Sequence, residues 1–350
     1  MLADILLLLT AGIWGFGFVA QRSGMEYIGP FAFNGIRFIL GSLSLLPFIF
    51  FRRMAIPAGL RHNQRLLPAS LSAGCCLFVA VIFQQFGVLF TTAGNAGFIT
   101  GLYVVFTPIF GIFLGKKTGP ATWLGAVFTI TGLYFLSVAG SSNSINPGDI
   151  LIVISAVFWT LHVLLIDYFA HAKDGARINA LAGVSRRETP KLKKCHGRHF
   201  FSIDPLELSA GQFAVCGVLA LAGAFLAEPY VGAAIESIDP ELLKAGLFAW
   251  LPFPELIKSG APFPAQALIP ILYGGLGSVG IAYTFQVIAQ RDAPPAHTTI
   301  ILCFEGGFAA LGGVLLLSEK IGPWTLLGFT LMLAGMLTTQ LEVIAKSREK

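Results

Sequence analysis

The stretch K-T-G-P-A-T-W-L-G at residues 117–125 has a near copy, K-I-G-P-W-T-L-L-G, at residues 320–328. The same Lys, Gly, Pro, Thr, Leu and Gly stand at corresponding positions, and Gly132 and Gly335 extend the match at the same offset. In each copy a Gly-Pro pair precedes an apolar run, as expected where a turn leads into a helix whose first position tolerates proline. An internal repeat of this kind predicts a chain built of two related halves.

The amino-acid composition is that of an integral membrane protein. Of the 350 residues, 55% are hydrophobic and only 12% are charged, and the mean hydropathy is +0.77. Soluble domains of ordinary composition lie outside this range. The N-terminal stretch lacks the basic region and the cleavage site of a signal peptide, so the first apolar run is expected to stay as a helix.

Apolar segments long enough to span a bilayer occur throughout the chain. A hydrocarbon core of about 30 Å needs about 20 residues of helix. Cutting the chain by that length predicts ten transmembrane helices, at residues 2–21, 30–51, 67–90, 95–115, 120–140, 148–170, 206–227, 266–290, 296–317 and 322–344. Two stretches do not fit as spans, the basic and polar 171–205 and the Pro- and Gly-rich 229–263. Both are expected to be extramembrane inserts.

The predicted helices divide into two repeats of five, at residues 1–145 and 146–350. Trp14 in the first helix matches Trp159 in the sixth at an offset of 145, and fewer matches link the second helix to the seventh and the third to the eighth. Lys and Arg are concentrated in the loops on the side of both termini, which predicts that both termini are cytoplasmic. Because five is an odd number, the two repeats must cross the membrane in opposite directions. The expected fold is therefore all-α, with ten transmembrane helices in two inverted-topology repeats.

Two further motifs point to a known family. They read N-A-G-F-I-T-G-L-Y-V-V-F-T-P at residues 95–108 and F-E-G-G-F-A-A-L-G-G-V-L-L-L-S-E at residues 304–319. With the inverted duplication and the tryptophans of the first and sixth helices, the chain resembles the EamA family of the drug/metabolite transporter superfamily, apart from the two inserts. The resemblance implies a secondary transporter in a bacterial-type inner (plasma) membrane. It would move a small organic metabolite or drug-like solute by alternating access around a site near the midplane.

A charge inside a predicted span costs at least about 2.5 kcal/mol, and two ionisable residues stand out there. Glu305 lies near the middle of the ninth helix, and Arg37 lies seven residues into the second. In one interpretation both face a cavity, where Arg37 holds a substrate carboxylate or phosphate and Glu305 holds a cation or a proton. In the other, they form a buried ion pair or are satisfied by backbone carbonyls. Coupling to protons through Glu305 is a hypothesis at this point.

Other polar and aromatic residues on the expected inner faces are candidates for the translocation pathway. They are Trp14, Gln84, Gln85, Asn95, Tyr103, Trp159, His162, Gln212, Tyr283 and Gln286. The alternatives are hydrogen bonding between helices and anchoring at the membrane interface. Trp14 and Trp159 rank first, because they occupy equivalent places in the two repeats. Pro108 predicts a kink in the fourth helix, of the kind that a moving gate could use.

Two other classes of protein remain to be weighed, an integral-membrane enzyme and a receptor or scaffold. The sequence has no metal-ligand cluster, nucleophile elbow or Gly-rich phosphate loop that would indicate an enzyme. A scaffold would need larger inserts than two stretches of 35 residues. We expect no cofactor, no metal and no nucleic-acid partner. The expected partners are a small-molecule substrate and membrane lipid, and a homodimer is left open.

Overall fold

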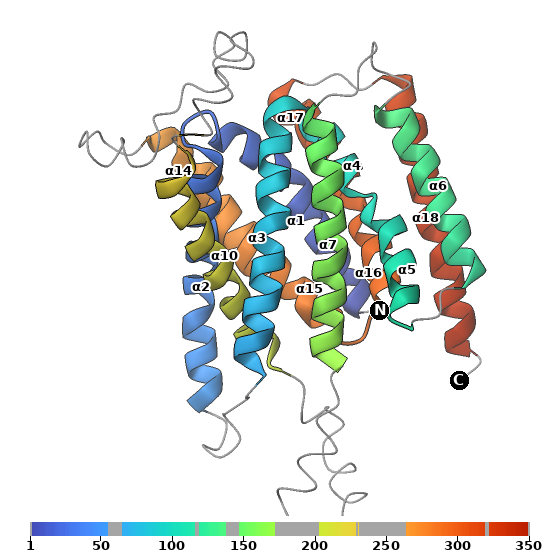
Figure 1. Ribbon diagram of the computed structural model, residues 1–350. Coiled ribbons are helices and arrows are strands. Elements are labelled where there is room, and N and C mark those ends of the chain that lie inside the picture. The colour runs from blue at the N-terminus through green and yellow to red at the C-terminus, as the bar shows by residue number, and fades with distance from the viewer. Residues whose placement is uncertain are drawn as a thin grey trace, which may run out of the picture.

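The computed structural model describes residues 2–54, 65–115, 119–137, 147–171, 203–228, 230, 264–318 and 322–348, and all regular structure in this part is helical (Figure 1). In chain order the helices are α1 (Leu2–Gly24), α2 (Pro30–Met54), α3 (Leu66–Phe90), α4 (Ala93–Thr100), α5 (Tyr103–Phe113), α6 (Pro120–Ser137), α7 (Pro147–His171), α10 (Pro205–Leu226), α14 (Ala265–Leu272), the π-helix η2 (Tyr273–Tyr283), α15 (Thr284–Ala289), α16 (Pro295–Leu302), α17 (Phe304–Leu317) and α18 (Pro323–Arg348).

Eight segments of the described residues are long and apolar enough to cross a membrane. They are α1, α2, α3, α4 with α5, α7, α10, α14 with η2 and α15, and α16 with α17. The prediction of an all-α, multi-pass membrane protein is therefore confirmed. The two remaining predicted spans coincide with α6 and α18, and their crossing of the membrane stays a prediction. Most of the two predicted inserts, and the lysines of the repeated stretch, lie outside the described residues.

The outer surface of the bundle is apolar over several helices. Large side chains such as Phe48 of α2, Leu71 of α3, Ile112 of α5 and Leu315 of α17 are about half exposed or more. In water such a surface would drive association, whereas lipid tails accept it and leave the backbone polar groups paired within the helices.

Helices from the two ends of the chain pack against each other throughout the bundle. α2 lies along α10 and η2, α3 along α7 and α10, and α1 along α17 and η2. Small residues permit the close approach: a Cβ on Gly74 of α3 would lie 2.8 Å from the carbonyl oxygen of Gln212 on α10. Glycines at such contacts let helix backbones meet closely in a membrane.

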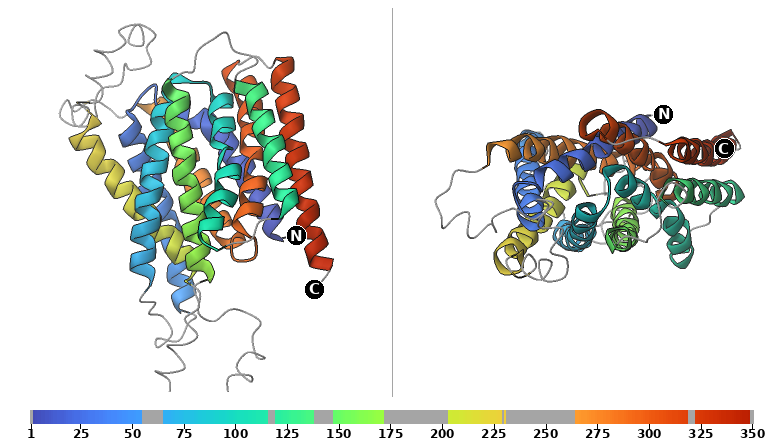
Figure 2. Two further views of the ribbon diagram at one scale, coloured as in Figure 1. Left: turned by 45° about the vertical axis from the view of Figure 1, so that its right-hand side comes forward. Right: turned by 90° about the horizontal axis from the view of Figure 1, so that it is seen from above.

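The repeated Gly-Pro stretches form a helix pair at one edge of the bundle. α6 begins at Pro120 and α18 at Pro323, as the sequence predicts for proline at a first helical position. The two helices lie side by side, away from the centre of the bundle (Figures 1 and 2). Phe135 stacks on Trp324 with ring centroids 5.5 Å apart, and a Cβ on Gly132 would lie 2.7 Å from the carbonyl oxygen of Gly328.

Two of the membrane-spanning segments are broken near their middles. α4 ends at Thr100 and α5 begins at Tyr103, while α16 ends at Leu302 and α17 begins at Phe304. The breaks face each other, because the Cys303 thiol donates a hydrogen bond to the carbonyl oxygen of Gly101 at 3.3 Å. Pro108 lies inside α5, after the break. The interruption of this segment thus comes before the proline, and a kink at Pro108 stays a prediction.

Candidate functional site

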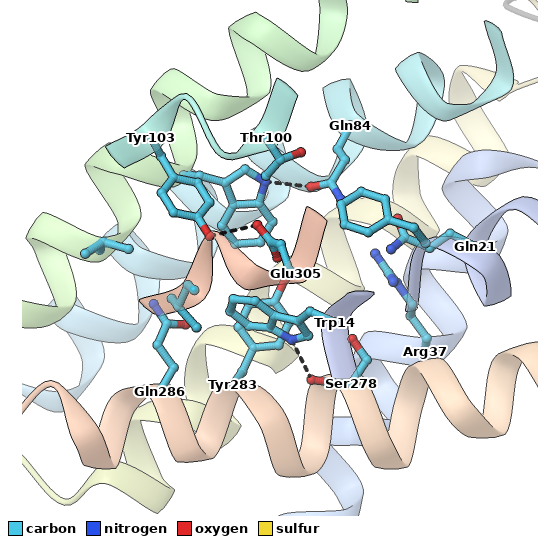
Figure 3. Close-up of a pocket in the computed structure, with 14 residues that line it drawn as sticks. Trp14, Gln21, Arg37, Gln84, Thr100, Tyr103, Ser278, Tyr283, Gln286 and Glu305 are labelled. Carbon is cyan, nitrogen blue, oxygen red and sulfur yellow. Dashed lines mark hydrogen bonds between the residues drawn. The ribbon is translucent and has the colours of Figure 1, made fainter. Parts of the chain in front are cut away.

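A cavity between the helices brings most of the predicted site residues together (Figure 3). The space between atoms, counted out into the open solvent at its mouth, is about 490 Å³. Its lining comes from α1, α2, α3, α7, both broken segments and the η2 to α15 segment. The lining residues are Trp14, Phe18, Gln21, Arg37, Gln84, Thr100, Tyr103, Trp159, Val163, Ser278, Tyr283, Gln286, Leu302 and Glu305.

Glu305 is placed in the cavity by the break between α16 and α17. It is the second residue of α17, and only 3% of its surface is exposed. Tyr103, the first residue of α5, donates its hydroxyl proton to Glu305 Oε1 at 2.8 Å. A helix start also presents free N–H groups and a partial positive charge, which favour a carboxylate. The two breaks thus explain how an acidic side chain is held in the middle of a span.

Arg37 is held by neutral partners. Its Nε donates to Asn34 Oδ1 at 2.9 Å, one turn earlier on α2. Its guanidinium carbon lies 5.4 Å from the ring centroid of Phe33 and 5.1 Å from that of Phe38, within range of a cation–π interaction. Among the described residues no carboxylate lies within ion-pair distance of Arg37, so the alternative of an Arg37–Glu305 salt bridge is not realised.

Three aromatic rings form one wall of the cavity. The ring centroids of Trp14 and Tyr283 are 4.5 Å apart, those of Trp159 and Tyr283 are 5.8 Å apart, and those of Trp14 and Trp159 are 6.0 Å apart. Both indole N–H groups already have acceptors: Trp14 Nε1 donates to the carbonyl oxygen of Ser278 at 3.2 Å, and Trp159 Nε1 donates to Gln84 Oε1 at 2.6 Å. The wall therefore offers ring surface to the cavity, with its indole donors already used.

The π-helix η2 supplies a part of the site that side-chain patterns do not reveal. Its Ser278 carbonyl receives the Trp14 indole, and Thr10 Oγ1 donates to the carbonyl oxygen of Ala282 at 3.1 Å. In a π-helix the backbone hydrogen bonds run from residue i to i+5, and such turns are frequent at functional sites. The packing of α1 onto η2 fixes the orientation of Trp14.

Eight of the residues predicted for the pathway from the sequence line the cavity. They are Glu305, Arg37, Trp14, Trp159, Gln84, Tyr103, Tyr283 and Gln286.

The other four predicted residues lie outside the cavity lining. His162 Nε2 and Gln212 Oε1 are 2.8 Å apart in the buried core, where the His162 ring is perpendicular to the rings of Trp159 and Tyr283. Gln85 is fully buried and its amide has no hydrogen-bond partner among the described residues. Asn95 lies in the first turn of α4. A part for these four residues in transport stays a prediction.

The structure adds lining residues that the sequence reasoning did not single out. Phe18 and Gln21 lie one and two turns beyond Trp14 on the same face of α1, so helical spacing from Trp14 could have found them. Thr100 and Leu302 end the helices before the two breaks. Val163 and Ser278 complete the set. Gln21 Oε1 is buried with no hydrogen-bond partner among the described residues, and the side chain lies beside Arg37 in Figure 3.

Comparison with known proteins gives the family. The model of the EamA-like transporter family matches residues 1–138 and 198–340. The chain belongs to the EamA-like transporter family. Membership agrees with the membrane-spanning helices and with the resemblance seen in the sequence. This EamA-like chain is thus a multi-pass membrane protein of a family of transporters.

Relatives of this EamA-like chain carry transporter names. An uncharacterized transporter of Archaeoglobus fulgidus is 32% identical over 48% of this chain and 50% of its own length. The match thus spans about half of that relative, as it does for a second Archaeoglobus transporter. The uncharacterized transporter YoaV of Bacillus subtilis is 22% identical over 93% of this chain and 91% of its own length. The uncharacterized inner membrane transporter YedA of Escherichia coli K12 is 29% identical over 42% of this chain and 47% of its own length.

The fold also has a counterpart among solved structures. One crystal structure superimposes with a TM-score of 0.65 over 99% of both chains, at 15% sequence identity. At that identity the likeness concerns the fold alone.

Proposed function

We propose that this EamA-like protein moves a small organic solute across a membrane by alternating access between two inverted halves. The observation that carries the proposal is the cavity at the helix breaks, which is lined from both halves of the chain and holds Arg37 and Glu305. Transporters built from inverted repeats place their substrate sites at such discontinuous helices near the midplane.

Contacts between equivalent residues support the inverted duplication. Trp14 and Trp159, which match in the sequence at an offset of 145, have ring centroids 6.0 Å apart. Tyr103 and Glu305 each follow a helix break, stand 202 residues apart and are hydrogen-bonded. Residues related by a two-fold axis contact each other only when they lie close to that axis. The proposed two-fold axis therefore runs close to the cavity, and both halves contribute residues to the cavity lining. The two ranges matched by the family model, 1–138 and 198–340, support the same division.

A difference between the two faces of the bundle supports alternation. On the face where α1 begins and α18 ends, here called the termini face, Asp4 Oδ1 and His297 Nε2 are 2.7 Å apart. Under the offsets of 145 and 202, the counterparts of these residues on the opposite face are Asp149 and Asn95. Asp149 Oδ1 is buried with no hydrogen-bond partner among the described residues. We call the Asp4–His297 contact a latch. It is formed on the termini face, and the corresponding contact is not formed on the opposite face. This difference is expected if the structure is one of two alternating states.

The cavity lining from α1 and α2 agrees with that assignment. Its α1 lining, from Trp14 to Gln21, comes from the half of the helix that leads away from the termini face. Arg37 lies in the first third of α2, near the same end of the bundle. We infer that the structure represents the state closed at the termini face. With both termini in the cytoplasm of a bacterial-type inner membrane, this is the outward-facing state.

Glu305 is the proposed carrier of a coupled proton. It is the carboxylate that lines the cavity within the described residues, it lies directly after a break, and its Oε1 is bonded to Tyr103 from the other half. A carboxylate inside a membrane is either paired or functional. At this position a change of protonation would act on a contact between the two halves.

Flux measurements with the purified full chain in proteoliposomes test the proposed function. We expect saturable uptake or efflux of one class of solute from a panel of organic acids, amino acids, nucleosides, amines and sugars. Substituting Trp159 by Ala should reduce that flux more than substituting Trp324, which lies on α18 outside the cavity lining. Linear leakage of every solute, identical to that of empty vesicles, would reject a transport function.

A further inference from the structure

The charge of Arg37 is the feature of the cavity that most directly selects a ligand. Of the described residues that line the cavity, it is the one Lys or Arg. A guanidinium carries five N–H donors. Only the Nε–H of Arg37 has an acceptor among the described residues, namely Asn34. A buried cation with unused donors is costly unless a partner is supplied. In this cavity the missing partner is an anion.

The number and geometry of the free N–H donors of Arg37 limit which class of anion can bind. With Nε fixed by Asn34, the two terminal nitrogens form a fork, which matches the two oxygens of a carboxylate. A phosphate dianion would bring a second negative charge, and the described lining offers no second cation for it. The carboxylate of Glu305 already accepts a hydrogen bond from Tyr103 and lies in the first turn of α17. The donors of Arg37 therefore favour a monoanion.

The aromatic wall of the cavity indicates the shape and polarity of the rest of the ligand. Arg37 lies over the ring of Phe38, Phe38 is 5.9 Å from Tyr283, and Tyr283 is 4.5 Å from Trp14. Ring contacts thus lead from the guanidinium to the indoles; Phe38 is fully buried behind the lining, and Tyr283, Trp14 and Trp159 present ring surface to the cavity. Since both indole N–H groups are bonded within the protein, this wall suits a flat apolar body and offers little to the hydroxyl groups of a sugar.

We propose that the substrates of this cavity are aromatic monocarboxylates, with the carboxylate on Arg37 and the ring against Trp14, Trp159 and Tyr283. The proposal rests on the transport function proposed above and names the substrate class of the same site. The amide of Gln21, which lies beside Arg37 in Figure 3, can donate a further hydrogen bond to the same anion. No covalent step is involved, because the ligand is bound and released unchanged.

Equilibrium binding to the full chain in lipid nanodiscs tests the chemistry. The probes are 2-naphthoate, 2-naphthalenemethanol, which keeps the rings but lacks the charge, and gluconate, which keeps the carboxylate but lacks the rings. We expect 2-naphthoate to bind at least about tenfold more tightly than either of the other two. Charge-assisted hydrogen bonds of this kind correspond to about 10- to 100-fold in affinity. Arg37→Gln should therefore remove most of the preference for naphthoate over the alcohol, and Arg37→Lys should keep part of it.

Control variants separate ligand contact from folding. Arg53→Gln removes a cation that lies outside the cavity and pairs with Glu207, so it should leave the preference unchanged. Trp14→Leu should weaken naphthoate and the alcohol alike, by about 3- to 10-fold, because it removes ring surface and no charge. Equal affinity for naphthoate and the alcohol, an unchanged preference in a folded Arg37→Gln protein, or tight binding of gluconate would each overturn the proposal.

Flux in proteoliposomes separates this proposal from the transport function itself. Saturable flux of naphthoate that is lost in Arg37→Gln supports both. Saturable flux of an amine or a sugar, with none of naphthoate, overturns the substrate class and leaves transport standing. Binding of naphthoate that follows the predicted pattern, with no flux of any solute, supports the ligand chemistry and rejects transport.

Discussion

The contact between Asp4 and His297 offers the sharpest test of alternating access. It joins the start of α1 to the start of α16 on the termini face, with 2.7 Å between Asp4 Oδ1 and His297 Nε2. If it holds that face closed, removing either side chain should raise the population of the state open at the termini face. A ligand or mutation shifts such an equilibrium only by its differential effect on the two states. The Asp4–His297 contact has such a differential effect, because it is present in the closed state and is broken when α1 and α16 separate.

The size of the shift follows from the burial of the pair. The side chain of His297 is 6% exposed and that of Asp4 is 42% exposed. Exposed ion pairs contribute about 0.2 to 1 kcal/mol, and hydrogen bonds to charged groups about 1.5 to 3 kcal/mol. A pair with one buried and one half-exposed partner falls between them, at about 1 to 1.5 kcal/mol. That corresponds to about a 5- to 12-fold change in the equilibrium between the two states.

Cysteine labelling measures the change. Thr10 is fully buried on α1 and bonds to the carbonyl of Ala282, so Thr10→Cys reports opening from the termini face. In a background with the five native cysteines replaced by alanine, we expect Asp4→Ala and His297→Ala each to raise the rate of maleimide labelling about 5- to 12-fold. The double variant should add little, because one contact is lost in all three cases.

A matched control lies on the opposite face. Asp149 corresponds to Asp4 in the other half, and its Oδ1 has no hydrogen-bond partner among the described residues in this state. Asp149→Ala should leave the labelling rate of the Thr10→Cys protein within about twofold of the parent, because no latch contact is lost on that face. An unchanged labelling rate in Asp4→Ala, or an equal rise in Asp149→Ala, would refute a role of the Asp4–His297 contact in closing the termini face.

Three further outcomes are expected. Glu305→Gln keeps an acceptor for the Tyr103 hydroxyl but cannot titrate, so transport should lose its dependence on pH while the protein stays folded; an unchanged pH profile would reject Glu305 as the proton carrier. Tyr103→Phe removes the hydroxyl that holds the carboxylate, and flux should fall about tenfold, with wild-type flux as the contrary result. Glu228→Ala removes the acceptor for the backbone N–H groups of Phe31 and Ala32 at the start of α2, which should destabilise the protein by about 0.5 to 2 kcal/mol in denaturant unfolding; unaltered stability would contradict a capping role.

The membrane-spanning helices could be predicted from sequence because the bilayer imposes their length and composition. The ionisable and aromatic residues of the cavity were predictable for a related reason. A charged residue such as Arg37 or Glu305 is costly inside an apolar span, so it is expected to face a cavity or a partner, and both line the cavity. Tyr103 and Tyr283 followed from the same expectation that polar groups point inward.

The helix breaks were beyond sequence reasoning because tertiary contacts hold them. Pro108 is the residue that favours a bend by its own chemistry, yet α5 continues through it. The interruptions lie at Gly101 and Cys303, where a thiol from one half bonds a carbonyl of the other. Ser278 could not be predicted from the sequence either. It contributes a backbone carbonyl from a π-helix, where patterns based on 3.6 residues per turn do not apply.

The chemistry of the cavity follows from its place beside the proposed axis. A residue on a two-fold axis meets its own equivalent, so a charge present in both halves would face a like charge. Two carboxylates at the 2.8 Å that separates Tyr103 from Glu305 could not both ionise. With a tyrosine in one half and a glutamate in the other, the same position becomes a donor and an acceptor. Trp14 and Trp159 carry no charge, and identical residues are tolerated in contact. The halves can therefore share a fold and a wall of rings, while the ionisable group that would drive transport must belong to one half alone.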